Sequence, residues 1–291
     1  MAKTREYVLY SDTKMANPNG DLINDNRPRQ DERTGRLEMS DVRIKRYVRD
    51  EMADQGHNVF VMPTKSKKKG FLDCKGIAKK VGEEHNVKED ELEGLLKKDF
   101  ADVKLFGAVV TKPKFNITGP LQIIWSQSIH EAEVKFAQGT SVMASNEGAE
   151  QGTIWSKYLT PFSLFRTYMI YNDQVAKRQN IPVEEEDLEI FKSALIDGMK
   201  NYKSTSKNHM PRLLIEVIYK NQYIDGELDF VETKAEKEDL DIRDISDFTF
   251  DLSPLVNYVE RKKEVIEKVN IYSHPKVQLI NSGERFEQYT I

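Results

Sequence analysis

Strand-like and helix-like segments alternate along this chain of 291 residues without the regular spacing of βαβ units. Residues 5–13 are rich in aromatic and β-branched types, which predicts a first strand. Ser40 or Asp41 can cap a helix that runs to about Gly56. Further strands are expected at 103–111, 121–136 (one strand or two), 213–219 and 276–280, further helices at 184–202 and 254–268, and a core strand or a buried helix at 158–171. The pattern predicts an α+β domain with a mostly antiparallel sheet, decorated by insertions.

Two stretches interrupt this pattern and are expected to project from the domain. Residues 57–100 hold a lysine-rich run from Lys65 to Lys69, followed by short charged helices. Residues 138–157 are mostly small and polar, with Met143 among them, which is typical of a projecting hairpin or mobile loop. Insertions of this kind often carry function. The remaining stretches, 1–56, 101–137 and 158–291, would form the main domain.

Composition excludes several classes of protein. Cys74 is the only cysteine, so a disulfide within the chain is impossible and a cysteine-based zinc site is not expected. No apolar run approaches the length of a membrane span, and the start lacks the apolar stretch of a signal peptide, so we expect a cytoplasmic protein without a membrane partner. The net charge is −4, but residues 225–251 alone hold eleven acidic and three basic residues. The rest of the chain is mildly basic, which permits binding to nucleic acid.

Catalytic motifs are scarce. None of the five histidines forms a metal-binding pair, and phosphate-cradling glycine motifs are absent, so no cofactor or metal is expected. Asp12 and Asp21 flank the first turn and could bind a magnesium ion or act as an acid–base pair, although a turn-stabilising role is more common for such an aspartate. His130 could act as a general base. The sequence favours a protein that is not an enzyme, with a ribonuclease using Asp21 or His130 as the alternative.

Basic stretches are more frequent than catalytic motifs. Arginine and lysine contact phosphates, and flat or slender side chains contact bases. The candidate stretches are Arg27-Pro28-Arg29, the helix face with Lys45, Arg46 and Arg49, the run Lys67-Lys68-Lys69, Lys112-Pro113-Lys114, and the segment from Lys203 to Lys207. Met143 could wedge between two bases. Trp155 and Phe162 are expected to pack beneath the loop. These stretches together predict an RNA-binding protein, whereas a structural protein whose basic stretches bind protein partners is the other possibility.

The region from Asp12 to Arg49 carries a family resemblance. Its residues run Asn17-Pro18-Asn19-Gly20-Asp21, then Arg27-Pro28-Arg29, then Ser40-Asp41-Val42-Arg43-Ile44-Lys45-Arg46. This order resembles the backbone subunit of type I CRISPR surveillance complexes (Cascade), within the RAMP superfamily, and its type I-B branch in particular. Further matches are Val103–Gly107, Gly119–Gln122, Ser126–His130, Gly152-Thr153, Pro161–Arg166 and Ser206-Lys207.

The resemblance implies a modified RRM-like (ferredoxin-like) palm with a finger insertion at 57–100 and a thumb hairpin at 138–157. Subunits of this family stack along a guide RNA (crRNA), and the thumb kinks the RNA so that most bases can pair with a target DNA strand. Relatives often carry a basic pair where this chain has Ile154-Trp155-Ser156-Lys157, so only Lys157 keeps the charge. The residues expected to contact RNA are Asn17, Asn19, Arg27, Arg29, Lys45, Arg46, Arg49, Lys67, Lys68, Lys69, Lys112, Lys114, Met143, Lys157, Arg166, Lys203 and Lys207.

The same resemblance implies a set of partners. These are other copies of the chain, a large subunit, a second RAMP-type subunit, a guide-processing endonuclease and a recruited helicase–nuclease. Type I relatives are regarded as non-cleaving, whereas type III relatives cut RNA with an aspartate in the region of Asp21. The acidic segment 225–251 would repel a phosphate backbone, so we expect it on an outer or inter-subunit surface, facing a basic surface of a neighbour.

Overall fold

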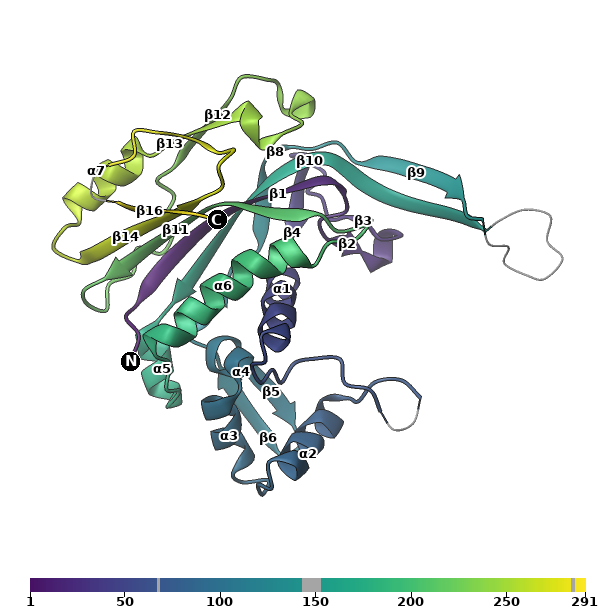
Figure 1. The fold of residues 1–291 in the computed structure, drawn as a ribbon, viewed down its shortest axis with the longest axis vertical. Coiled ribbons are helices and arrows are strands. Elements are labelled where there is room, and N and C mark those ends of the chain that lie inside the picture. The colour runs from purple at the N-terminus through teal and green to yellow at the C-terminus, as the bar shows by residue number, and fades with distance from the viewer. Residues whose placement is uncertain (67–68, 143–152, 284–285) are drawn as a thin grey trace.

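One large twisted sheet organises the protein (Figure 1). The computed structural model describes residues 1–66, 69–142, 153–283 and 286–291, and over these residues nine strands join the sheet. Its order is β16-β14-β11-β1-β10-β8-β4, with β7 and β9 also paired to β10. Over the described residues, the strand pairs of this sheet are antiparallel except β14 with β16. The strands are β1 (Arg5–Ala16), β4 (Arg36–Met39), β7 (Leu121–Ile123), β8 (Ser126–Glu131), β9 (Lys135–Thr140), β10 (Ile154–Tyr171), β11 (His209–Tyr219), β14 (Ile266–Ser273) and β16 (Glu287–Thr290).

Strand β1 lies at the centre of the sheet, between β10 and β11. Side chains alternate across a strand, so its apolar residues divide between two cores. Tyr7 and Leu9 face one core, and Val8 and Tyr10 face the other. Both faces are therefore covered. The expected antiparallel α+β fold is confirmed, whereas the comparison with an RRM-like palm stays a prediction.

Two helices cover the first face of the sheet. These are α1 (Asp41–Asp54) and α6 (Glu185–Asn201), with the short α5 (Asp173–Gln179) nearby (Figure 1). Ser40 is the N-cap of α1, because its side chain accepts a hydrogen bond from the Arg43 amide. The helices approach closely at Gly198, where an added Cβ would lie 2.5 Å from the Tyr47 carbonyl oxygen. The helices expected from Ser40 and at 184–202 are both confirmed.

A small lobe lies next to this helical layer, on the side away from the sheet (Figure 1). It contains α2 (Cys74–Glu84), α3 (Leu92–Asp99), α4 (Ala101–Phe106) and the hairpin of β5 (Gly107–Thr111) and β6 (Lys114–Thr118). The strand expected at 103–111 is wrong in its first half, where the chain is helical. Gly107, with φ +72°, ends that helix and lets the strand begin. The lobe therefore extends past residue 100, the end of the insertion expected from sequence.

The acidic segment covers the second face. Its strands β12 (Glu232–Ala235) and β13 (Phe248–Asp251) form a small sheet with β15 (Gln278–Ile280), beside α7 (Ser253–Arg261) and the short turns η2 (Asp239–Asp241) and η3 (Ile245–Asp247). Apolar side chains from this segment, such as Phe250, pack onto Tyr10 of β1. Glu6 anchors it, because this buried carboxylate accepts hydrogen bonds from the amides of Asp225 (3.0 Å) and Gly226 (2.8 Å). The apolar side of the segment is thus part of the core.

Several predicted boundaries differ from the structure near the C-terminus. The helix expected at 254–268 ends at Arg261, and the chain is strand β14 from Ile266. Apolar residues from 265 onward fit a strand as well as a helix, and pairing with β11 decides between them. The stretch 121–136 is divided among β7, β8 and the start of β9, and 158–171 is strand. Within the described part of the chain, no helix combines the length and apolar character needed to cross a membrane.

Candidate nucleic-acid interface

The loop after β1 is rigidly tied to the start of α1. Its short strands β2 (Gly20–Asp21) and β3 (Arg27–Pro28) pair with each other around the turn η1 (Leu22–Asn24). The Asn17 side chain, which is buried, donates to the Asn26 carbonyl over 2.6 Å. The Asn19 side-chain oxygen accepts from the amide and hydroxyl of Ser40, at 3.1 and 3.0 Å. Both asparagines of the sequence motif thus shape the loop.

Asp21 stabilises the turn. Its carboxylate accepts from the Ile23 amide at 3.2 Å and from the Asn24 side chain at 2.9 Å, and it lies 3.5 Å from the Arg29 guanidinium. Asp12 is buried and forms an ion pair with Arg212, with the closest N–O distance at 2.6 Å. Each carboxylate is held by its own partners. Their geometry matches the turn and ion-pair roles and not an acid–base pair.

His130 is also engaged inside the protein. Its Nδ1 lies 2.7 Å from the Glu131 carbonyl oxygen, and its Nε2 accepts a hydrogen bond from the Leu164 amide at 3.2 Å. This pattern assigns the neutral tautomer with the proton on Nδ1. Burial lowers the pKa of the ring, which favours the neutral form. Since both nitrogens have partners and the residue is 3% exposed, His130 is a structural residue in this conformation.

Two cations without an acidic partner meet where the loop, α1 and β11 come together. Lys207 donates to the Asn17 carbonyl at 2.7 Å, and Arg43 lies over the Tyr47 ring at 4.1 Å. Burial, with the neighbouring charge of Arg43, lowers the pKa of Lys207 to about 8. The Arg43 Nε and the Asn17 Oδ1 are buried without a hydrogen-bond partner. Among the described residues neither cation forms an ion pair, so their charge is available to an external anion.

His209 holds this junction in shape. Its Nε2 donates to the Pro18 carbonyl at 3.2 Å, and its Nδ1 accepts from the Thr13 hydroxyl at 3.2 Å. Burial beside Arg43 and Lys207 lowers its pKa to about 3. The ring is therefore neutral at physiological pH. It connects β11 to the loop without adding charge.

The basic face expected on α1 is largely neutralised within the chain. Lys45 pairs with Asp41 at 2.9 Å, and Arg46 pairs with Asp50 at 2.6 Å. Arg49 is only 11% exposed and bonds the fully buried Asp102 at 3.0 Å. The expectation that Arg49 lies on an open face is wrong, because its ion pair holds α1 against the lobe. Arg43, nearly two turns earlier on the same helix, is the available cation, and the sequence motif contains it without marking it as a candidate.

The hairpin β9–β10 projects far beyond the sheet (Figure 1). Trp155 pairs with Gly139 in its register and covers that glycine, where an added Cβ would lie 2.6 Å from the indole. Lys157 lies over the Trp155 ring at 5.5 Å and its amine is 3.5 Å from the Thr205 carbonyl oxygen, near Lys207. The arms begin at residue 135, before the expected boundary at 138. Met143, Lys67 and Lys68 lie outside the described residues.

The remaining predicted residues are distributed over the molecule. Arg27 is exposed, and Arg29 donates its amide to the Asn19 carbonyl at 3.0 Å. Lys203 is exposed in the segment before β11. The structure therefore gathers one subset around the loop and the base of the hairpin: Asn17, Asn19, Arg27, Arg29, Lys157, Lys203 and Lys207. Lys69, Lys112 and Lys114 belong to the lobe, and Arg166 forms an ion pair with Asp229 of the acidic segment.

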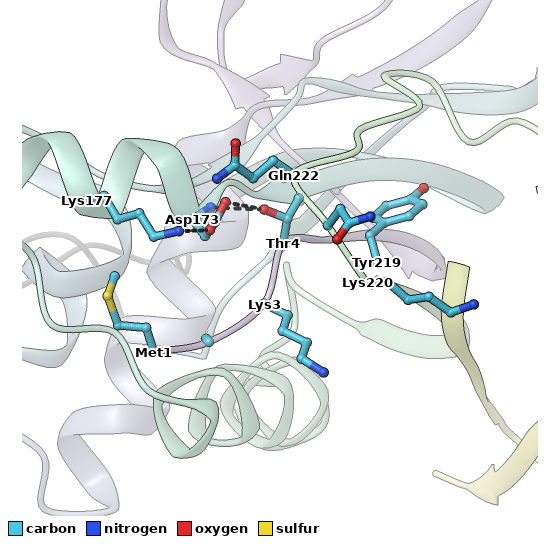
Figure 2. Close-up of a pocket in the computed structure, with 10 residues that line it drawn as sticks. Met1, Lys3, Thr4, Asp173, Lys177, Tyr219, Lys220 and Gln222 are labelled. Atoms are coloured by element: carbon cyan, nitrogen blue, oxygen red, sulfur yellow. Dashed lines mark hydrogen bonds and ion pairs between the residues drawn. The ribbon is translucent and has the colours of Figure 1, made fainter. Parts of the chain in front are cut away.

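A pocket at the other end of β1 has a different character. Figure 2 shows it between the N-terminus, α5 and the end of β11. Asp173 accepts from Thr4 at 2.7 Å and from Lys177 at 2.5 Å, so its carboxylate is already matched by a cation. Over the described ranges, no group of three or more His, Cys, Asp or Glu side chains is arranged to hold a metal ion. The neighbouring pair of Arg43 and Lys207 lies at the loop end of β1, and this end is the candidate interface.

Comparison with known proteins identifies the family. The family model described as CRISPR-associated protein Cas7 matches residues 3–253. This chain belongs to the Cas7 family. A Cas7 protein of Haloferax volcanii is 26% identical over 94% of this chain and 88% of its own length. The resemblance found in the sequence is confirmed at the level of the family, and the type I-B branch stays a prediction.

Solved structures share the fold of this Cas7-family chain. One described as "CRISPR RNA-guided surveillance complex, pre-nicking" has a chain with a TM-score of 0.58 at 14% identity, covering 99% of this chain and 96% of that one. Another, described as "CRISPR RNA-guided surveillance complex", gives a TM-score of 0.54 at 15% identity, over 98% and 94%. At such identities the likeness shows a common fold.

Proposed function

We propose that this protein is a crRNA-binding backbone subunit of a CRISPR surveillance complex of the Cascade type. The observation that carries the proposal is the junction of Arg43 and Lys207, two neighbouring cations without an acidic partner among the described residues. Like charges repel, so such a pair is stabilised when an anion binds between or beside them. Membership of the Cas7 family and the fold shared with chains of surveillance complexes support RNA phosphate as that anion.

The proposed role is non-catalytic. Asp21 stabilises a turn, and His130 is buried with both ring nitrogens engaged. A ribonuclease using either residue would have to rearrange it first. Replacing Asp21 by alanine should therefore leave bound RNA at its original length, as in the unchanged protein. RNA that is shortened by the unchanged protein and intact with Asp21→Ala would contradict this.

Assembly along the RNA is the finer part of the proposal. Several large apolar side chains stand out from the described surface: Leu22 and Ile23 on η1, and Phe136 and Ile154 on the hairpin. Apolar groups exposed on projecting elements are typical of interfaces. Contacts between different surfaces of identical chains generate closed rings, or open helical filaments where the rotation does not close. We expect the hairpin to contact the RNA or the next copy, so that the guide is presented to target DNA. Met143, which lies outside the described residues, stays the predicted wedge.

The other Cascade subunits and the helicase–nuclease stay proposed partners. The acidic surface of 225–251 is a candidate contact for a basic neighbour, although part of its charge is neutralised within the chain. Asp244 pairs with Lys14 at 2.8 Å, and Asp247 pairs with Lys237 at 2.8 Å. The apolar side of the segment is buried in the core.

The proposal is tested by purifying the chain from cells with and without a CRISPR array and sequencing the bound RNA. RNA of repeat–spacer origin is expected only with the array, and it should be lost from the double variant Arg43→Glu and Lys207→Glu. A charge-matched control, Lys234→Glu with Arg261→Glu, changes exposed cations of the acidic-segment side and should keep the RNA. RNA held equally by both double variants, or absent from the unchanged protein in the presence of its array and partner subunits, would overturn the proposal.

A further inference from the structure

Both tryptophans of this protein lie partly in solvent. The chain holds two, Trp125 at 52% exposure and Trp155 at 43%. Tryptophan is usually well buried, because its ring is the largest apolar surface among the side chains. Each ring is accompanied by a cation, Arg29 at 5.9 Å from Trp125 and Lys157 at 5.5 Å from Trp155. Trp155 belongs to the projecting hairpin, whereas Trp125 lies on the sheet side of the loop and has no role in the sequence-based site.

The Trp125 ring is held outward by the backbone on both sides. It lies between β7 and β8, where Ile123 and Ser126 point into the core. The Ser126 hydroxyl is 2.6 Å from the Thr167 hydroxyl, and the Ile124 amide donates to the Tyr168 carbonyl at 3.0 Å. These contacts fix the chain against β10 before and after the tryptophan. The indole is therefore a preorganised surface, so little ordering would be needed when a ligand stacks on it.

Arg29 connects this ring to the candidate interface. Its backbone amide donates to the carbonyl of Asn19, and the Asn19 side chain accepts from Ser40, the N-cap of α1. Arg43 lies in the first turn of that helix. The Arg29 guanidinium is 34% exposed and lies 3.5 Å from Asp21. A flat guanidinium beside an indole offers two planar groups and one positive charge. The planar faces suit a nucleobase, while Asp21 shares the charge of Arg29, so the phosphate contact is expected from the Arg43–Lys207 junction.

We propose that Trp125, together with Arg29, forms a base-stacking subsite for a single-stranded nucleic acid bound at the Arg43–Lys207 junction. This inference rests on the proposed function and adds a base contact that is separate from the hairpin. Stacking tolerates any base, because every base has a π-face, so the subsite would bind guides of different sequence. Ile124, next to Trp125 in sequence, is also exposed, at 51%.

Intrinsic fluorescence tests this directly, because Trp155→Phe leaves Trp125 as the single tryptophan of the full chain. We expect its emission to be quenched when a 30-nucleotide oligouridylate is added. Inorganic polyphosphate carries the anionic groups without bases, so it should compete for the junction without the same quenching. Affinity of the Trp155→Phe protein, measured by filter binding, is the reference for the variants below.

Substitutions separate stacking from simple apolar contact. Trp125→Ala should weaken oligouridylate binding about 10-fold, and Trp125→Leu should weaken it nearly as much because the π-face is lost. Trp125→Phe should recover most of the affinity. The salt dependence of binding should stay the same in all three, since stacking releases no counterions.

The outcomes distinguish this inference from the proposed function. If the reference protein binds RNA, but Trp125 emission is unchanged and Trp125→Ala binds equally well, the stacking subsite is overturned and the proposed function stands. If Trp125→Leu binds as the reference does, the surface acts as an apolar contact, for example for a protein partner, and stacking is also overturned. If the reference protein and its unsubstituted parent bind no RNA, the proposed function fails, and this inference fails with it.

Discussion

Arg43 and Arg49 lie on the same helix, less than two turns apart, and meet opposite environments. Arg49 bonds the buried Asp102, and Arg46 bonds Asp50, so both charges are neutralised within the chain. Arg43 and Lys207 are neighbours without an acidic partner in the described residues. In the sequence, both arginines belong to the same basic helix, and nothing in it separates the paired one from the unpaired one. The comparison teaches that folding, and not the number of cations in a stretch, decides which positive charges remain available to an external anion.

The largest effect on stability should come from removing Asp102, the buried partner of Arg49. Asp102 also accepts from the amides of Phe60 (2.8 Å) and Val61 (3.0 Å), so Asp102→Ala leaves Arg49 and two amides without their partner. We expect the free energy of unfolding to fall by about 3–5 kcal/mol. Asp50→Ala, which removes the partner of the exposed Arg46, should cost about 1 kcal/mol or less. Urea denaturation measures both. Similar losses for the two variants would remove the distinction between buried and surface pairs.

The role of the unpaired cations Arg43 and Lys207 in RNA binding is tested by neutralising one of them at a time. Arg43→Ala and Lys207→Ala should each weaken RNA binding about 10-fold or more, because each removes a charge-assisted phosphate contact. Each should also reduce the slope of log affinity against log salt by about 0.7. Arg46→Ala should weaken binding by about 2-fold at most, since its charge is already matched by Asp50. Equal effects at positions 43 and 46, measured by filter binding across a salt series, would break the comparison.

The pH dependence of binding should identify Lys207. Burial beside Arg43 lowers its pKa from 10.5 to about 8. The ammonium form binds phosphate, so affinity should fall as pH rises above 8, by up to about 10-fold near pH 9.5. The free energy of unfolding responds in the opposite direction. Between pH 8 and 10.5 Lys207 binds fewer protons in the folded chain than in the unfolded chain, so its contribution to stability increases as pH rises.

A conservative variant controls for other titrating groups. Lys207→Arg keeps the positive charge across this range, so binding should become nearly independent of pH between 7 and 9.5. The affinities are measured at constant ionic strength. An unchanged pH profile in Lys207→Arg would assign the titration to another residue.

The smallest effect should come from converting a paired cation into an unpaired one. Lys14 of β1 lies next to the junction, where its carbonyl accepts from Asn208, and its amine bonds Asp244 at 2.8 Å. That contact is the main cause of the lowered pKa of Asp244, which is about 2. Asp244→Asn should release the Lys14 charge and raise RNA affinity about 2-fold at low salt. A decrease in affinity would show that the acidic segment assists binding.

Long periodic elements were predictable from the sequence, and short ones depended on the rest of the chain. The first strand, α1 and α6 follow from residue type, caps and apolar spacing. Residues 103–106 carry apolar types that suit a strand, yet they form a helix that ends at Gly107. Residues from 266 pair with β11 and become a strand. In both places tertiary contacts overrode local preference.

The candidate site was predictable in part. The motif around Asn17 and Asn19 correctly marked the loop, because such residues form turns whatever surrounds them. The state of Arg49 could not be predicted, since its partner Asp102 lies 53 residues away. Arg43 could not be identified either, because only the folded chain shows that no acidic side chain among the described residues forms an ion pair with it. Trp125 gave no signal, since exposure of a single aromatic residue depends on the packing around it.

The central position of β1 also sets the order in which a growing chain can fold. Arg5 pairs with Tyr171 on one side and Ile218 on the other, so β1 is complete only after about 200 further residues have been synthesised. At typical rates of translation this takes roughly 10 to 40 s. The lobe can form earlier, because β5 and β6 are neighbours in sequence. A ribosome making this protein therefore carries a first strand that lacks one or both of its neighbours for most of each round of synthesis, and that strand is where chaperones would be needed.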